Sequence, residues 1–169
     1  MQRILKLLTK FRRLQRRDLL LLITAFLLLG TVRLGLWLMP FHALFKLLMG
    51  VDPSVFANKA SSRTTEGEAL DACHQSVTQS RRVAKIVWSV NVASRYMPGK
   101  VKCLARALAT QVLMNWHQCV SELRIGVDKT PEGGVRAHAW IEYQGRVIIG
   151  NLNDLSQFKP LFAYRGIEP

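Results

Sequence analysis

Two residues of this chain combine a reactive side chain with a position that suits acyl-transfer chemistry. Cys103 follows a loop that contains Pro98-Gly99, and it opens an apolar-periodic run that predicts a helix. Unpaired backbone N–H groups and the positive end of the helix dipole gather in such a first turn, and both favour a thiolate. His138 lies thirty-five residues later, at the head of a predicted strand. A cysteine and a histidine in these positions can serve as the nucleophile and base of a cysteine acyl-transfer enzyme.

Neighbouring residues would support this chemistry. Lys100 and Lys102 add positive charge close to the thiol in sequence, and the backbone N–H of Cys103 can stabilise an oxyanion. Trp140 comes two residues after His138 and therefore shares its strand face. We expect Trp140 to wall the substrate-binding site and to exclude water from it.

The elements that must position these residues follow from the period of the apolar residues. Residues up to about 115 show helical periods, and residues after 121 alternate as strands separated by turn-rich segments. The expected helices are 2–14, 18–38, a short one ending near 49, 66–96 and 103–115, and the expected strands are 122–127, 135–143 and 146–149. The tail from Asn151 is expected to be loop-like. Helices followed by an antiparallel meander indicate an α+β fold in which the cysteine helix packs on a small sheet.

Composition divides the chain into three parts. Residues 1–50 form a basic, hydrophobic helical region with nine Lys or Arg and a single acid, Asp18. Residues 51–64 predict a linker, and the capping box Thr65-x-x-Glu68 opens a domain of residues 65–169. The basic region could meet nucleic acid, an anionic membrane surface or an acidic partner. We expect a membrane-surface or partner contact and no nucleic acid, because an apolar helix follows and no nucleic-acid motif is present.

The apolar stretch near the N-terminus bears on the location of the protein. Leu19–Met39 reaches the length of a membrane span, about 20 residues, only if it includes Arg33. We therefore expect a core or interfacial helix, with a transmembrane span as the alternative. A secretory signal is not expected, because no convincing cleavage site follows. Three cysteines, an odd number, indicate a reducing compartment and predict a cytoplasmic protein that is free or membrane-associated.

No metal site or other cofactor is expected. Cys73, His74, His117 and Cys119 can be grouped on paper, but their spacings match no standard zinc pattern. Cys119 is instead expected to be a core residue at the start of the sheet.

Several motifs occur together in the order of a known enzyme family. They are Pro98-Gly99, Cys103-Leu-x-x-Ala107-Leu, Leu123-Arg-Ile-Gly126-Val, Ala137-His138-Ala139-Trp140-Ile-Glu142 and Gly145-Arg-Val-Ile-Ile-Gly150. Over roughly residues 80–162, this pattern resembles the stand-alone lasso-peptide maturation proteases, which have a transglutaminase-like, papain-like cysteine protease core. The basic, apolar N-terminal helices are also similar to those of stand-alone members.

The resemblance implies a substrate, partners and residue roles. Such an enzyme removes the leader from a ribosomally made precursor peptide, and an ATP-dependent, asparagine-synthetase-like cyclase then closes an isopeptide ring on the freed core. A separate leader-recognition protein is implied as a partner, since stand-alone members lack a fused recognition domain. By position, Cys103 is the nucleophile and His138 the base.

The third member of the implied catalytic set has two candidates. In the family, an acidic residue usually follows the histidine on the next strand. This chain has no acid there, and Asn151 is nearest in register while Asp154 is the nearest carboxylate. Either Asn151 orients His138 as an amide, as in papain-like enzymes, or the loop brings Asp154 back to the ring.

Two alternatives to leader cleavage stay open. The same core could transfer the acyl group to an amine, as transglutaminases do. The chain could also be a non-catalytic, membrane-associated scaffold of the maturation complex, and the missing acid after His138 favours that interpretation.

Overall fold

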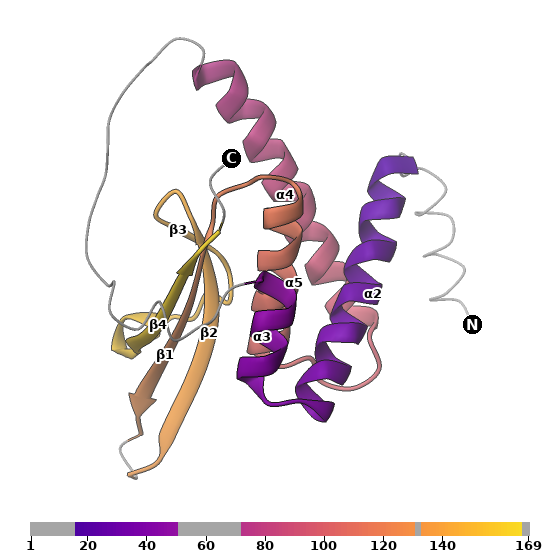
Figure 1. The fold of residues 1–169 in the computed structure, drawn as a ribbon. Coiled ribbons are helices and arrows are strands. Elements are labelled where there is room, and N and C mark those ends of the chain that lie inside the picture. Colours follow the sequence, from indigo (N-terminus) through magenta and orange to yellow (C-terminus); the bar gives the residue numbers. More distant parts are fainter. Residues whose placement is uncertain (1–15, 51–71, 131–132, 167–169) are drawn as a thin grey trace, which may run out of the picture.

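The fold places a helical layer on one face of a small antiparallel sheet (Figure 1). The computed structural model describes residues 16–50, 72–130 and 133–166. Within them the helices are α2 (Arg16–Leu38), α3 (Phe41–Met49), α4 (Ala72–Tyr96) and α5 (Cys103–Trp116). The strands are β1 (Glu122–Lys129), β2 (Val135–Tyr143), β3 (Arg146–Ile149) and β4 (Lys159–Arg165), with a short 3-10 turn at Leu155–Gln157. The predicted α+β class is confirmed.

The helix that carries the cysteine begins and ends close to its predicted limits. It starts at Cys103 and continues to Trp116, one residue past the expected end. The predicted helix 2–14, the linker 51–64 and the capping box Thr65-x-x-Glu68 lie outside the described residues, and α4 is described from Ala72.

The sheet has one more strand than predicted. Its order is β3-β2-β1-β4, and β4 pairs antiparallel with β1, with Tyr164 opposite Leu123. The expectation that the tail is loop-like was therefore wrong. The second residue of β4 is Pro160, and proline argues against a strand in sequence. It is tolerated here because β4 lies at the edge of the sheet, where one row of backbone groups needs no strand partner.

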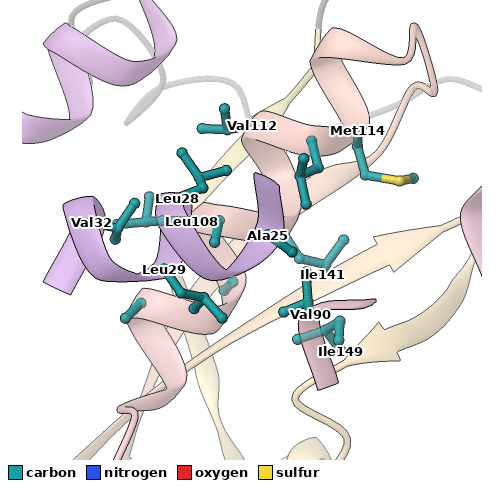
Figure 2. Close-up of a cluster of buried hydrophobic side chains, with 14 of the residues drawn as sticks. Ala25, Leu28, Leu29, Val32, Val90, Leu108, Val112, Met114, Ile141 and Ile149 are labelled. Atoms are coloured by element: carbon teal, nitrogen blue, oxygen red, sulfur yellow. The ribbon is translucent and has the colours of Figure 1, made fainter. Parts of the chain in front are cut away.

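One hydrophobic core joins the helices to the sheet (Figure 2). Helix α2 buries a stripe of residues at helical spacing, which are Leu22, Ala25, Leu28, Leu29 and Val32. This stripe packs against α4 and α5, and Ile141 of β2 contributes to the same cluster. One face of helix α2 is thus part of the protein core, in agreement with the expectation of a core or interfacial helix for residues 18–38.

A buried polar network fixes the far end of α5 against the sheet. The fully buried amide of Gln111 donates to the carbonyl of Ser121, just before β1, at 3.3 Å and accepts from the Ser121 hydroxyl at 3.1 Å. The backbone N–H of Gly166 donates to the same Ser121 carbonyl at 2.8 Å. Because buried polar groups are costly unless paired, this network holds α5 in one position relative to β1 and the end of β4. Cys103, at the opposite end of α5, is positioned by this anchoring.

Candidate active site

Cys103 is the first residue of α5, as the sequence predicts. The preceding residue, Lys102, has an extended backbone (φ −69°, ψ 152°), and its side chain makes no capping hydrogen bond. The first N–H groups of α5 therefore have no side-chain cap, and N–H groups of this kind are suited to binding an anion or an oxyanion. Cys103 is a free, half-buried thiol.

His138 lies on β2, opposite Gly126 of β1, and its ring is held by a backbone carbonyl. The Nε2 atom of His138 is 2.7 Å from the carbonyl oxygen of Gly150. A carbonyl oxygen can only accept a hydrogen bond, so Nε2 must carry the proton. In the neutral ring, Nδ1 is then the nitrogen with a free lone pair, which is the state required of a general base.

Two aromatic rings flank the imidazole. The ring of Trp140 is stacked near that of His138, with centroids 6.2 Å apart and an interplanar angle of 13°. The ring of Phe158, which precedes β4, is tilted against it at 5.6 Å. These contacts restrict the rotation of the imidazole and keep part of its surface dry. The sequence analysis did not identify Phe158 as a neighbour of His138, because it lies in the tail that was expected to be loop-like.

Gly150 was quoted in the sequence motif, but its role was not predicted. Its φ is +80°, a conformation that favours glycine. A Cβ atom at this position would stand 2.7 Å from the carbonyl oxygen of Ala139 and 3.0 Å from Cβ of Trp140. Only glycine therefore allows the chain to approach β2 closely enough for the contact with His138. The available signal was a glycine directly after the apolar strand residues Ile148-Ile149.

Neither expected orienting side chain makes the hydrogen bond to His138. Among the described residues, Asn151 is exposed and its amide has no hydrogen-bond partner. Asp154 accepts a hydrogen bond from Arg136 at 2.8 Å, and Arg136 also donates to Asp128 at 2.5 Å. The hydrogen bond from Arg136 is the main cause that lowers the pKa of Asp154, and the nearby His138 lowers it further by a smaller amount. Asp154 thus lies near the imidazole but is held by Arg136, because a guanidinium is the stronger partner for a carboxylate.

Trp140 is packed inside the protein and does not form an accessible wall of a binding site. Only 4% of its surface is exposed, and its indole N–H donates to Glu142 at 2.9 Å. Its ring fills the space above Gly126, where a Cβ atom would approach it to 2.9 Å. Trp140 therefore offers little accessible surface for the substrate-binding role that the sequence predicted.

Cys103 and His138 lie on elements that pack together, α5 and β2. Ala139 and Ile141 belong to the core that β2 shares with α5. Because side chains alternate along a strand, His138 and Trp140 point to the other face of the sheet. Within the described residues, no hydrogen bond joins the Cys103 sulfur to the His138 ring.

A hollow of about 770 Å³ lies beside the first turn of α5. Its walls come from the second half of α2 and from the segment around Cys103, including Lys102 and Ala105. Apolar side chains such as Phe26 and Trp37 form most of the lining, and Arg33 and Lys100 add positive charge. The surface next to the thiol is therefore apolar and cationic.

Comparison with known proteins identifies the family. A profile described as the transglutaminase-like superfamily matches residues 47–163, a segment that includes Cys103, His138 and Gly150. No curated protein matches the chain, and no solved structure matches it either. Members of this superfamily are typically cysteine-dependent enzymes. Since the match covers more than half of the sequence, this chain belongs to the transglutaminase-like superfamily.

Proposed function

We propose that this protein is a cysteine endopeptidase that removes the leader from a ribosomally made lasso-peptide precursor. The observation that carries the proposal is the hydrogen bond from Nε2 of His138 to the Gly150 carbonyl, which leaves Nδ1 free as a base. The family membership supports cysteine-dependent acyl chemistry. The choice of a lasso-peptide precursor rests on the order of the sequence motifs around Cys103 and His138.

The proposed reaction proceeds through a thioester on Cys103. Nδ1 of His138 takes the thiol proton as the sulfur attacks the scissile carbonyl, and the N–H groups of the first turn of α5 stabilise the oxyanion. His138 then returns the proton to the departing amine, which is the new N-terminus of the core peptide. A water molecule, deprotonated by His138, hydrolyses the thioester and releases the leader as a carboxylic acid. One oxyanion donor contributes about 3 kcal/mol in comparable sites.

This reaction requires the Cys103 sulfur to reach Nδ1 of His138. Strand β3 pairs only with Ile141–Tyr143 of β2, so the part of β2 that carries His138 has a strand neighbour on one side alone. On the other side runs the loop that follows β3, and this loop supplies Gly150. In the proposed active state, the thiol and the imidazole meet at the open side of β2.

The proposal includes the two protein partners that the sequence resemblance implies. A separate leader-recognition protein delivers the precursor, and an ATP-dependent, asparagine-synthetase-like cyclase uses the freed amine. Neither partner is needed for the thioester chemistry itself, but the recognition protein is expected to lower the precursor concentration at which cleavage occurs.

The direct test is reconstitution. The full-length chain, its recognition partner and the precursor peptide are mixed, and mass spectrometry follows the leader fragment. We expect cleavage by the wild type and by Cys119→Ala, and none by Cys103→Ala, because Cys119 lies in the core and is 2% exposed. Cleavage by Cys103→Ala at the wild-type rate would remove Cys103 from the mechanism.

Acyl transfer to an amine is the second candidate within the same chemistry. Hydrolysis adds water to the leader, whereas transfer adds the amine, so the mass of the leader product separates the two. Reaction in the presence of a primary amine at high concentration is the sensitive form of this measurement.

A non-catalytic scaffold is the third candidate, and the lack of a hydrogen bond between Cys103 and His138 among the described residues favours it. The rate of Cys103 alkylation by iodoacetamide distinguishes it from an enzyme. A rate above that of a cysteine in a free peptide, which falls in His138→Ala, supports the pairing of thiol and imidazole. A rate equal to that of the free peptide in both proteins supports the scaffold.

A further inference from the structure

Helix α2 is apolar on both of its faces, but the described residues cover only one of them. Its buried stripe packs on α4 and α5, as described above. Its opposite face exposes large apolar side chains along its whole length, among them Leu20, Ile23, Leu27, Leu34, Trp37 and Leu38. Soluble proteins rarely expose a continuous apolar surface of this extent, because its contact with water is unfavourable. This outward face of α2 needs a cover.

The charges around this face are nearly all of one sign. Arg16 and Arg17 begin the helix, and Arg33, Lys100 and Lys102 surround the hollow near its end. The acid within α2, Asp18, is already paired with Lys85 of α4 at 2.6 Å. A partner that presents negative charge next to an apolar phase would match both the exposed apolar side chains and the positive charges of this surface.

The structure also restricts how α2 can meet a membrane. Its length and composition would allow it to span a bilayer. However, its inner stripe is part of the protein core, and one polar contact fastens the helix near each end. Asp18 pairs with Lys85, and Arg33 donates a hydrogen bond to the carbonyl of Pro98. A helix that keeps these contacts has to lie along the surface of the bilayer.

We propose that the outward face of α2 docks on an anionic lipid bilayer, with the helix parallel to the membrane plane. Apolar side chains enter the boundary between head groups and acyl chains, as in other interfacial helices. Trp37, which is 82% exposed, is of the residue type that is enriched at this depth. Arg33, Lys100 and Lys102 meet the lipid phosphates.

A bilayer explains the surface better than a bound peptide does. A peptide in the hollow would cover Phe26, Leu34 and Trp37, which line it. It would leave Leu20 and Leu27, outside the hollow and both exposed, in water. Docking of the whole helix face on lipid covers both sets. The proposal does not depend on the peptidase activity, since lipid binding by this surface requires neither Cys103 nor His138.

The apolar part of the proposal is tested by flotation of the full-length chain with vesicles of phosphatidylcholine and phosphatidylglycerol. The variant Leu20→Gln/Leu27→Gln/Trp37→Ser removes three side chains that are 64%, 63% and 82% exposed, so the core stays intact. We expect its vesicle affinity to fall by at least about tenfold, since each large apolar side chain contributes to partitioning in proportion to its area.

The matched control replaces three similarly exposed apolar side chains outside α2 with the same polar residues. Val135→Gln/Leu161→Gln/Trp116→Ser changes side chains that are 70%, 64% and 62% exposed on the sheet and at the end of α5. This control is expected to float like the wild type. Equal flotation of both variants would overturn the proposal. It would also be overturned if the wild type does not bind vesicles and instead forms a dimer, or a complex with the recognition protein, through α2.

The charged part is tested with Arg33→Gln/Lys100→Gln/Lys102→Gln on two vesicle compositions. On anionic vesicles we expect a loss of about fivefold per removed charge, and on pure phosphatidylcholine little change. An equal loss on both compositions would argue against contact with lipid phosphate. An alkaline carbonate wash should release the wild type from vesicles, and retention through the wash would show a spanning helix instead.

Discussion

The Nε2 atom of His138 lies 2.7 Å from the carbonyl oxygen of Gly150, and this backbone contact stands in the place of the side-chain partner, Asn151 or Asp154, that the sequence analysis expected. A carbonyl fixes the tautomer of the ring as an acid would, because it accepts only from a protonated nitrogen. It carries no full charge, however, and so it stabilises the imidazolium less than a carboxylate does. In this chain, the orientation of the His138 imidazole depends on the backbone of one glycine.

Gly150→Ala is predicted to disturb both stability and activity. The new Cβ atom would stand 2.7 Å from the Ala139 carbonyl, at a φ of +80° that alanine disfavours. We expect a loss of about 3 kcal/mol in the free energy of unfolding, measured by urea titration. Leader cleavage should fall by about a hundredfold under conditions where the variant is folded, because the imidazole is displaced.

Gly145→Ala is the matched control for this prediction. Gly145 also has a positive φ, +71°, but no atom lies within 4 Å of its added Cβ. It should lose only about 1 kcal/mol, which is the cost of the backbone conformation, and keep its cleavage rate. If the two variants lose equal stability and equal activity, close packing at Gly150 has no special role.

Asn151→Ala and Asp154→Asn are predicted to retain cleavage to within a few-fold of the wild type. Neither side chain makes a hydrogen bond with the ring, and the carboxylate of Asp154 is taken up by Arg136. His138→Ala should lose at least about a hundredfold, since it removes the base itself. A loss in Asp154→Asn as large as that in His138→Ala would assign the orienting role to Asp154 in the active state.

Two glycines of α2 are predicted to respond to alanine in opposite directions. At Gly30 the added Cβ would be 4.0 Å from Met97, so the variant should gain up to about 1 kcal/mol from higher helix propensity. At Gly35 the Cβ would stand 2.5 Å from a methyl carbon of Leu44, which is buried, so the variant should lose about 1 kcal/mol. Thermal unfolding of both variants checks the pair. A gain in Gly35→Ala would show that α3 does not pack on α2 this closely.

The stability of the protein is predicted to fall at alkaline pH. Burial raises the pKa of the Cys119 thiol, against smaller opposing effects of Arg82 and Gln79, and burial also raises the pKa of Tyr143. Both groups hold their protons more tightly in the folded state. Their contribution to the free energy of unfolding is therefore complete below the unfolded pKa of cysteine, about 8.5, and this contribution decreases above that pH. Urea titrations from pH 7 to 10 should show this decrease, and Cys119→Ala should reduce it between pH 8 and 9.5.

Tyr143→Phe is a second variant for the same region. The buried Tyr143 hydroxyl has no hydrogen-bond partner among the described residues. Its removal should leave stability at pH 7 unchanged or raise it by up to about 1 kcal/mol, because an unsatisfied polar group leaves the core. A loss of more than 1 kcal/mol in Tyr143→Phe would show that the hydroxyl has a partner in solution.

Features that depend on neighbouring residues in sequence were predictable. The start of α5 at Cys103 follows from the Pro98-Gly99 loop and the apolar run after it, and strand β2 follows from alternation. Strand β4 was missed because Pro160 weakens its local signal, and only the pairing with β1 compensates for that. The orienting group of His138 was missed for a related reason, since a backbone carbonyl has no side-chain type that a sequence can reveal.

By itself, the sequence determined the cysteine at a helix start, the histidine on a strand and the α+β order of elements, because these depend on local period and residue type. Only the tertiary structure decided that Gly150 holds His138, that Asp154 is bound by Arg136, and that the other described elements cover one face of α2. These three results depend on the distances between segments far apart in the chain. Such distances are set by the packing of the whole core, which no short stretch of sequence specifies.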